Sequence, residues 1–210
     1  TEIDFTHGPY LSENITSTTL TPSGTSGSVN ITASASTFAA TDVGRLVSFS
    51  SGRAKITGFT SATVVAATTQ VNFANTNAIT AWKLGAFSGT TGHPSCVSFF
   101  EQRLVFAGTI AEPQTLYFSK AGDYENMTTG TNADDAMVYT IASNQVNRIR
   151  YLKSVRTLIV GTTGGEFTVS ADGTDAAVTP TNIVIKKQSS YGTANVDAIP
   201  AGNAVLFLQK

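Results

Sequence analysis

The chain has 210 residues, of which 13% are charged, and its formal net charge is −1. The charged share is about half that of an ordinary soluble domain. The basic residues are spread along the sequence, which argues against tight nucleic-acid binding. A protein that conducts DNA while binding it weakly remains open. Cys96 is the single cysteine, so an internal disulfide and a cysteine-based zinc or redox pair are excluded, which favours folding in the cytosol.

The first residues, TEIDFTHGPY, lack a basic region followed by an apolar one, and no apolar run reaches the roughly 18 residues that a membrane span requires. The sequence therefore predicts neither a cleaved secretion signal nor a membrane segment. Helical periodicity is missing, whereas Thr, Val and aromatic residues alternate with polar ones between turns rich in Gly, Asn and Asp. We expect an all-β protein.

Residues 1–84 are predicted to form an N-terminal segment and a small β-barrel or sandwich. Polar and apolar residues alternate there in runs that are typical of strands with one solvent-facing side. These runs are 28–32, 45–49, 53–59, 63–67 and 78–84, the last around the only tryptophan, Trp82. Five or six short strands in such a region favour a small barrel or a two-layered sheet. A Gly-rich linker is expected to follow at 85–92.

Residues 93–210 contain a repeated pattern. The segment FFEQRLVFAGT at 99–109 is echoed by YLKSVRTLIVGT at 151–162 and more loosely at 199–207. Each copy consists of a strand, a short polar turn and an apolar second strand, and a third strand follows the first two copies at 114–119 and 166–170. The copies lie about fifty residues apart, as four-stranded propeller blades do.

We therefore expect residues 93–210 to form a partial β-propeller of antiparallel meanders. An antiparallel sandwich, in which similar hairpins arise by chance, is the alternative. Three blades cannot close a ring, and the apolar run 205–208 would leave a sheet edge unpaired. The chain is accordingly expected to be a fragment of a longer protein.

The sequence predicts no catalytic, cofactor or metal site. His7 precedes Gly-Pro and His93 precedes Pro, which marks turns, and no further His or Cys lies close to either. Neither a G-x-S-x-G motif nor a P-loop is present. The acidic residues that cluster are Asp123, Glu125, Asp134 and Asp135. Two of them could serve a propeller glycosidase, but a solvated loop is the preferred interpretation.

Five segments resemble the tail proteins of podoviruses and related prophages, in the same order. They are GPYLSEN at 8–14, DVGRLV at 42–47, FFEQRLVFAGT at 99–109, SKAGDYEN at 119–126 and SSYG at 189–192. The resemblance implies a subunit of the tail nozzle, or tubular tail protein: a β-propeller with a small β-domain, assembled as a ring that is typically hexameric. It implies no catalytic residues and no cofactor.

The same resemblance implies the partners and the location of the protein. The ring would lie below the portal and its head-tail adaptor, contact tail fibre or spike proteins, and let genomic DNA pass through its lumen without sequence-specific binding. The protein would be a virion component of the tail, assembled in the cytoplasm of the bacterial host.

Three residues are predicted to make contacts between blades or subunits: Arg103, Asp123 and Tyr124. Arg103 is expected to lie over an aromatic ring or to pair with a carboxylate of a neighbouring blade. The loop that holds Asp123 and Tyr124 is expected to touch the next blade or subunit, with the Tyr124 ring buried. The alternative function is a carbohydrate- or receptor-binding β-module of a phage tail, with Trp82 or Tyr191 as an exposed aromatic platform.

Overall fold

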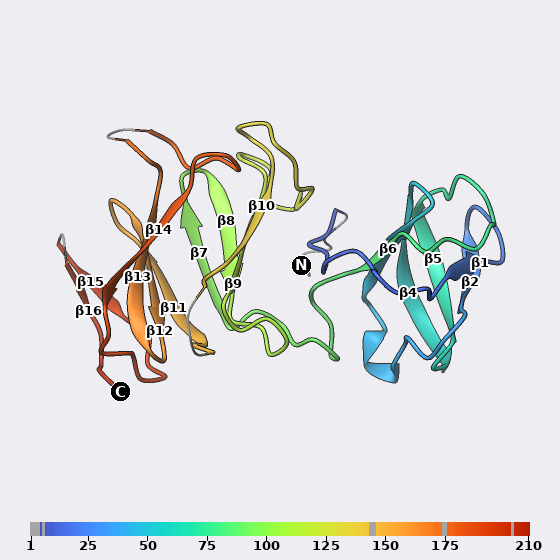
Figure 1. The fold of residues 1–210 in the computed structure, drawn as a ribbon, viewed down its shortest axis with the longest axis horizontal. Coiled ribbons are helices and arrows are strands. Elements are labelled where there is room, and N and C mark those ends of the chain that lie inside the picture. The colour runs from blue at the N-terminus through green and yellow to red at the C-terminus, as the bar shows by residue number, and fades with distance from the viewer. Residues whose placement is uncertain (1–4, 6, 143–145, 174–175, 203) are drawn as a thin grey trace. The chain divides into compact units, whose positions relative to one another are not determined.

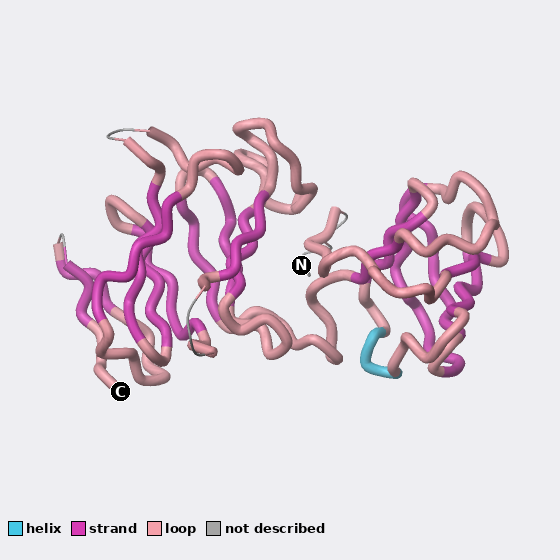
Figure 2. The backbone as a smooth tube through the Cα atoms, viewed as in Figure 1, coloured by secondary structure: helices cyan, strands magenta, loops and turns pink. Residues whose placement is uncertain are grey.

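The computed structural model describes residues 5, 7–142, 146–173, 176–202 and 204–210. The chain divides into two compact units: a barrel unit, residues 8–92, and a meander unit, residues 93–210 together with the first seven residues. Regular structure is almost entirely antiparallel strand, which confirms the all-β class (Figures 1 and 2). Within the described ranges the single helical element is the 3-10 turn η1, Ala40–Asp42, and nothing helical there has the length and apolarity to cross a bilayer.

The barrel unit contains one six-stranded antiparallel sheet in the order β1-β2-β5-β4-β3-β6. Its strands are β1 Leu20–Pro22, β2 Ser28–Ala33, β3 Leu46–Phe49, β4 Gly52–Ser61, β5 Val64–Val71 and β6 Trp82–Leu84. Strict alternation along β2 places Val29, Ile31 and Ala33 inside while their neighbours face solvent. The alternation therefore gives the sheet one apolar face and one wet face.

This sheet curls into a half-barrel. Its two long central strands are paired with three register irregularities, and such bulges bend a strand and increase its twist. The curl brings the edge strand β1 back toward the residues before β6: Leu20 and Ile79 exchange two backbone hydrogen bonds of 2.9 Å. The concave side holds the core, which includes Leu20, Ile31, Val47, Phe49, Ile56, Val65 and Phe73.

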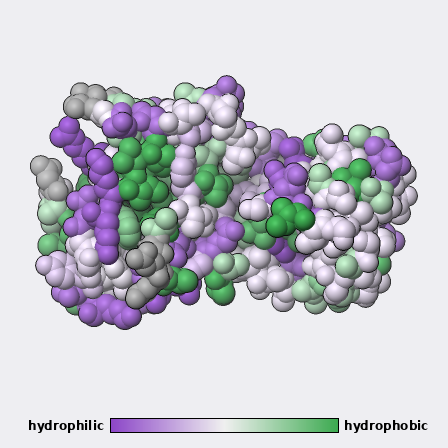
Figure 3. Space-filling model, viewed as in Figure 1, coloured by the Kyte–Doolittle hydropathy of each residue, from purple (hydrophilic) through white to green (hydrophobic). Residues whose placement is uncertain are grey.

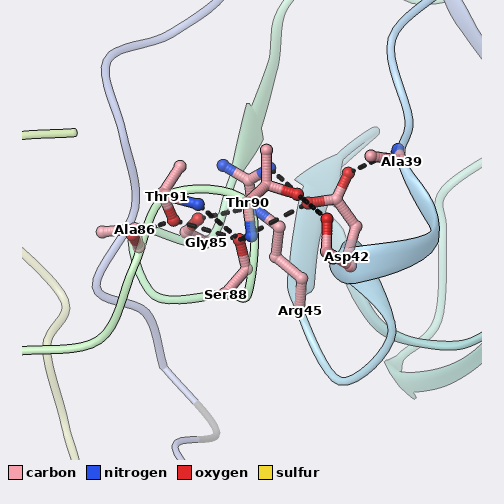
Figure 4. A network of polar contacts seen from close by, with 9 residues as sticks. Ala39, Asp42, Arg45, Gly85, Ala86, Ser88, Thr90 and Thr91 are labelled. Carbon is pink, nitrogen blue, oxygen red and sulfur yellow. Dashed lines mark hydrogen bonds and ion pairs between the residues drawn. The ribbon is translucent and has the colours of Figure 1, made fainter. Parts of the chain in front are cut away.

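Residues 85–92, expected to be a linker, instead pack into the barrel unit (Figure 4). The buried side chains of Asp42 and Arg45 form an ion pair of 2.9 Å. Arg45 Nε donates to the carbonyl of Gly85 at 2.7 Å, and the Thr90 hydroxyl donates to Asp42 Oδ1 at 2.7 Å. Buried charges are tolerated only with such partners, so this segment completes the unit.

The meander unit contains two four-stranded antiparallel sheets and a final hairpin (Figure 1). The first meander consists of β7 Cys96–Phe100, β8 Arg103–Ala107, β9 Thr115–Phe118 and β10 Met137–Thr140. The second consists of β11 Ile149–Ser154, β12 Leu158–Thr162, β13 Gly165–Ser170 and β14 Val184–Ser189. The hairpin pairs β15 Ile199–Ala201 with β16 Ala204–Leu206. In both meanders, strands that are consecutive in sequence are neighbours in the sheet.

One apolar core joins the two meanders. The first strand of each, β7 and β11, lie beside each other. Buried residues from both sheets form a single cluster that includes Phe100, Val105, Leu116 and Phe118 of the first and Leu152, Val160, Phe167 and Val169 of the second. Figure 3 shows apolar residues gathered between the two sheets on the viewed face. Neither meander buries this face alone, and the packing between them therefore supplies much of the stability.

Candidate interface on the first meander

Arg103 is buried at the start of β8, and its guanidinium fills a ring of backbone carbonyls within its own meander. It donates to the carbonyls of Ser119 at 2.8 Å, Ala133 at 2.6 Å and Asp135 at 2.7 Å, with a longer bond of 3.3 Å to that of Asp134. Burial lowers the pKa of Arg103, and the nearby Asp134 carboxylate opposes that effect. Arg103 was expected to contact an aromatic face or a neighbouring blade's carboxylate, but it binds these backbone carbonyls instead. Several carbonyls suit a guanidinium, because it has five N–H donors in a rigid, planar arrangement.

The loop between β9 and β10 is fixed by this arginine and by Lys120. Lys120 Nζ lies 3.0 Å from a carboxylate oxygen of Asp134 and 3.6 Å from one of Asp135. The hydrogen bond from Lys120 lowers the pKa of Asp134. A glycosidase acid needs the opposite, a raised pKa that keeps its proton available. Asp123 lies in the same loop and accepts a hydrogen bond of 3.1 Å from the Asn126 amide.

The loop presents Tyr124 beside an exposed aromatic residue of β7. The ring centroids of Tyr124 and Phe99 are 5.2 Å apart and the ring planes are nearly perpendicular, at 76°. Phe99 is 60% exposed and Tyr124 41% exposed, so the expected burial of the tyrosine ring is only partial. Val97 lies two residues before Phe99, on the same side of β7, and is also exposed. Val97, Phe99 and Tyr124 form what we call the β7 apolar strip.

Phe5 covers a neighbouring part of the same sheet face. Val97 lies opposite Phe106 in the β7–β8 register, and the Phe5 ring meets Phe106 edge-on at 5.5 Å. The backbone N–H of Met127 donates to the carbonyl of His7 at 2.9 Å. Sequence reasoning grouped residues 1–7 with the barrel, and the aromatic Phe5 was the one signal that could have suggested an apolar contact elsewhere.

The two aromatic residues considered as sugar platforms differ in exposure. Trp82 packs its ring against the barrel core and donates from Nε1 to the carbonyl of Thr18 at 2.9 Å. Tyr191 is 66% exposed. Of the pair, Tyr191 is the one that presents a ring to solvent.

No group of three or more His, Cys, Asp or Glu side chains in the described ranges is arranged to hold a metal ion. The sequence matches no protein-family model and no curated protein. An inference about the function of this chain therefore rests on its fold and on the chemistry of its surface.

Proposed function

We propose that this chain is part of a structural subunit of a bacteriophage tail nozzle, or tubular tail ring, that conducts DNA out of the virion. One observation carries the proposal: two consecutive four-stranded meanders share one core, and a further hairpin, β15–β16, follows them. This is the arrangement expected for part of a β-propeller. A small curled β-unit accompanies it, as the resemblance of five sequence segments to podovirus tail proteins implies.

The hairpin β15–β16 follows the two meanders, and the residues just before and after it contact the second meander. The backbone N–H of Thr193 donates to the carbonyl of Thr162 at 2.9 Å. Lys153 Nζ lies 2.7 Å from a carboxylate oxygen of Asp197, just before β15. The Phe207 ring lies 6.2 Å from the Tyr151 ring, on β11. The first meander, the second meander and the hairpin thus follow one another in the order expected for blades around an axis.

Exposed apolar surface supports assembly into a ring. The β7 apolar strip is open on the first meander, and the hairpin exposes Ile199 and Leu206. Apolar surface of this kind is suited to contacts with other blades, other copies of the chain or adjacent tail proteins. A ring of six subunits, contacts with the head-tail adaptor and with fibre or spike proteins, and passage of DNA through the lumen all form part of the proposal.

Electron microscopy and mass measurement of the full-length protein that contains this chain test the proposal. We expect closed rings with a channel that admits duplex DNA. The double variant Phe99→Ser/Tyr124→Ser should assemble less well than the wild type, whereas Val43→Ser, at an exposed apolar residue of the barrel unit, should assemble normally. A full-length protein that stays monomeric at concentrations used for assembly would refute the ring.

A carbohydrate-binding module of a phage tail is the second candidate, and the exposure of Tyr191 is what favours it. Aromatic faces open to solvent can stack on sugar rings. A glycan array would decide between the two: selective binding that Tyr191→Ala abolishes supports the sugar module, and no binding to any glycan removes this candidate.

A further inference from the structure

A cavity of about 240 Å³ lies where the first strands of the two meanders meet. Its walls come from the start of β7, from β11 and from the segment before β15. The lining residues are Ser95, Cys96, Val97, Arg150, Tyr151, Leu152, Lys153 and Asp197. The candidate interface described above uses Val97 alone among them, and the proposed function assigns the cavity no role.

The cavity carries an excess of positive charge. Although cations are spread along the chain, Arg148, Arg150 and Lys153 fall within six consecutive residues. Arg150 lines the cavity, and Arg148 lies beside it: Arg148 Nη2 and the hydroxyl of the lining residue Ser95 both donate to the carbonyl of Gly108. Burial raises the pKa of the Cys96 thiol, and the charges of Arg148 and Arg150 oppose that rise. The sole acidic residue among the lining residues, Asp197, is an exposed side chain that pairs with Lys153 at 2.7 Å. Two of these cations, Arg150 and Lys153, line the cavity beside this single carboxylate.

Arg148 and Arg150 each have an N–H donor that makes no hydrogen bond within the described part of the chain. Arg150 Nη1 donates to Asn195 Oδ1 at 3.0 Å, and Arg148 Nη2 donates to the carbonyl of Gly108 at 3.3 Å. The Nε atoms of both arginines are buried, and within the described part of the chain neither has a hydrogen-bond partner. A buried N–H without an acceptor is unfavourable, and that cost disappears when an acceptor or an ordered water occupies the site.

We propose that this cavity binds a small tetrahedral oxyanion of the phosphate or sulfate class. Arg150 and Lys153 contact the anion, and Arg148 adds positive charge from behind. An arginine fork offers planar, charge-assisted hydrogen bonds to oxyanions, and a neighbouring ammonium adds a point charge. The cavity has room for the anion and a few waters, each of which takes up about 30 Å³ in the liquid. This volume matches a single small anion, and we take the ligand to be a free anion rather than a phosphate of a nucleic-acid strand.

Calorimetric titration with inorganic phosphate, at an ionic strength held constant with chloride, tests the proposal. We expect saturable one-to-one binding by the wild type. Arg150→Gln should weaken it about tenfold or more, which corresponds to the loss of a charge-assisted hydrogen bond. Lys186→Gln removes one exposed positive charge from β14 of the same meander unit and should bind as the wild type does. Absence of binding by the wild type, or equal binding by Arg150→Gln and Lys186→Gln, overturns the proposal.

The single cysteine gives a second readout that needs no variant. Cys96 lines the cavity and is buried, so its alkylation by iodoacetamide should be slow in the wild type, and bound phosphate should slow it further. A short single-stranded oligonucleotide without terminal phosphates should not slow it. Protection by the oligonucleotide and none by inorganic phosphate would show that the surface recognises nucleic acid, and the oxyanion site would then be wrong.

Discussion

Arg103 illustrates how a buried cation is held without a carboxylate. Its guanidinium donates to carbonyls of a single loop and of Ser119, and a lysine ammonium offers neither the reach nor the planar fork for that set. Arg103→Lys should therefore lower the free energy of unfolding by about 2–4 kcal/mol, because buried carbonyls lose charge-assisted donors. Urea denaturation followed by circular dichroism measures this loss.

Arg156→Lys provides the matched control. Arg156 is exposed in the turn between β11 and β12, so the same substitution should change stability by less than about 0.5 kcal/mol. An Arg103→Lys protein that unfolds at the same urea concentration as Arg156→Lys would show that the carbonyl ring contributes little.

Glu166 is a buried carboxyl group in β13. Ser189 Oγ donates to its Oε2, and its Oε1 has no partner among the residues that the structure describes. Burial raises its pKa. The folded protein therefore keeps this proton at a pH where the unfolded chain has released it, and the free energy of unfolding falls as pH rises from the ordinary carboxyl pKa to the raised one.

Glu166→Gln keeps the shape of the side chain and cannot ionise. We expect the variant to lack this decline in stability between acidic and neutral pH, and to be at least as stable as the wild type near pH 7. Unfolding free energies measured across that range test this, with Glu125→Gln, at an exposed loop position, as the control. Parallel pH profiles for the wild type and Glu166→Gln would contradict the prediction.

Strand β12 depends on a glycine for its pairing with β11. Gly161 and Tyr151 are register partners, and a Cβ at Gly161 would clash with Tyr151 Cε1. Gly161→Ala should destabilise the meander unit by about 2 kcal/mol or more, since the tyrosine ring is buried and has little space to move. Thermal unfolding is the measurement.

Gly58→Ala is the corresponding substitution in β4, where the new Cβ would be 3.6 Å from the nearest side-chain atom. This control should be neutral or slightly stabilising, because alanine reduces the freedom of the unfolded chain. Equal effects at the two glycines would mean that the Tyr151 ring moves aside without cost.

Strands with a strong local pattern could be predicted, and those without it could not. The hairpin β7–β8 and the pair β12–β13 follow from apolar runs separated by short turns. The fourth strands, β10 and β14, were not identified as separate strands, because each follows a long polar loop and few side chains are buried: one in β10 and none in β14. Tertiary contacts, rather than local sequence, decide such strands.

The same limit applies to the candidate interface. Residues 103, 123 and 124 were identified by their types and by the resemblance, but three of the four carbonyl partners of Arg103 lie 30 to 32 residues away in a loop with no periodic pattern. The contact between Phe99 and Tyr124 likewise joins a strand to a loop that sequence spacing does not relate. Long-range contacts of this kind require coordinates.

Division of the chain into units leads to a prediction about fragments. The barrel core is built from residues between 8 and 92, so a fragment of that range should unfold cooperatively with an all-β circular dichroism spectrum. A fragment of residues 8–84 lacks Gly85 and Thr90, the partners of the buried Arg45–Asp42 pair. It should be less stable by about 2 kcal/mol or more, because buried charges lose hydrogen bonds.

Chemical denaturation of the two fragments measures this difference. Equal stability would show that residues 85–92 act as a linker, as sequence composition indicates. Composition does not distinguish the two cases, because glycine and serine are frequent both in flexible linkers and in tight loops that follow a protein surface.

Strand β14 forms the outer edge of the second meander and carries adjacent exposed lysines, Lys186 and Lys187. An outer strand offers unpaired backbone donors and acceptors to any other strand. Edge-to-edge pairing of two molecules at β14 would bring these ammonium groups together and expel the water around them. Fibre growth through this edge is thereby penalised.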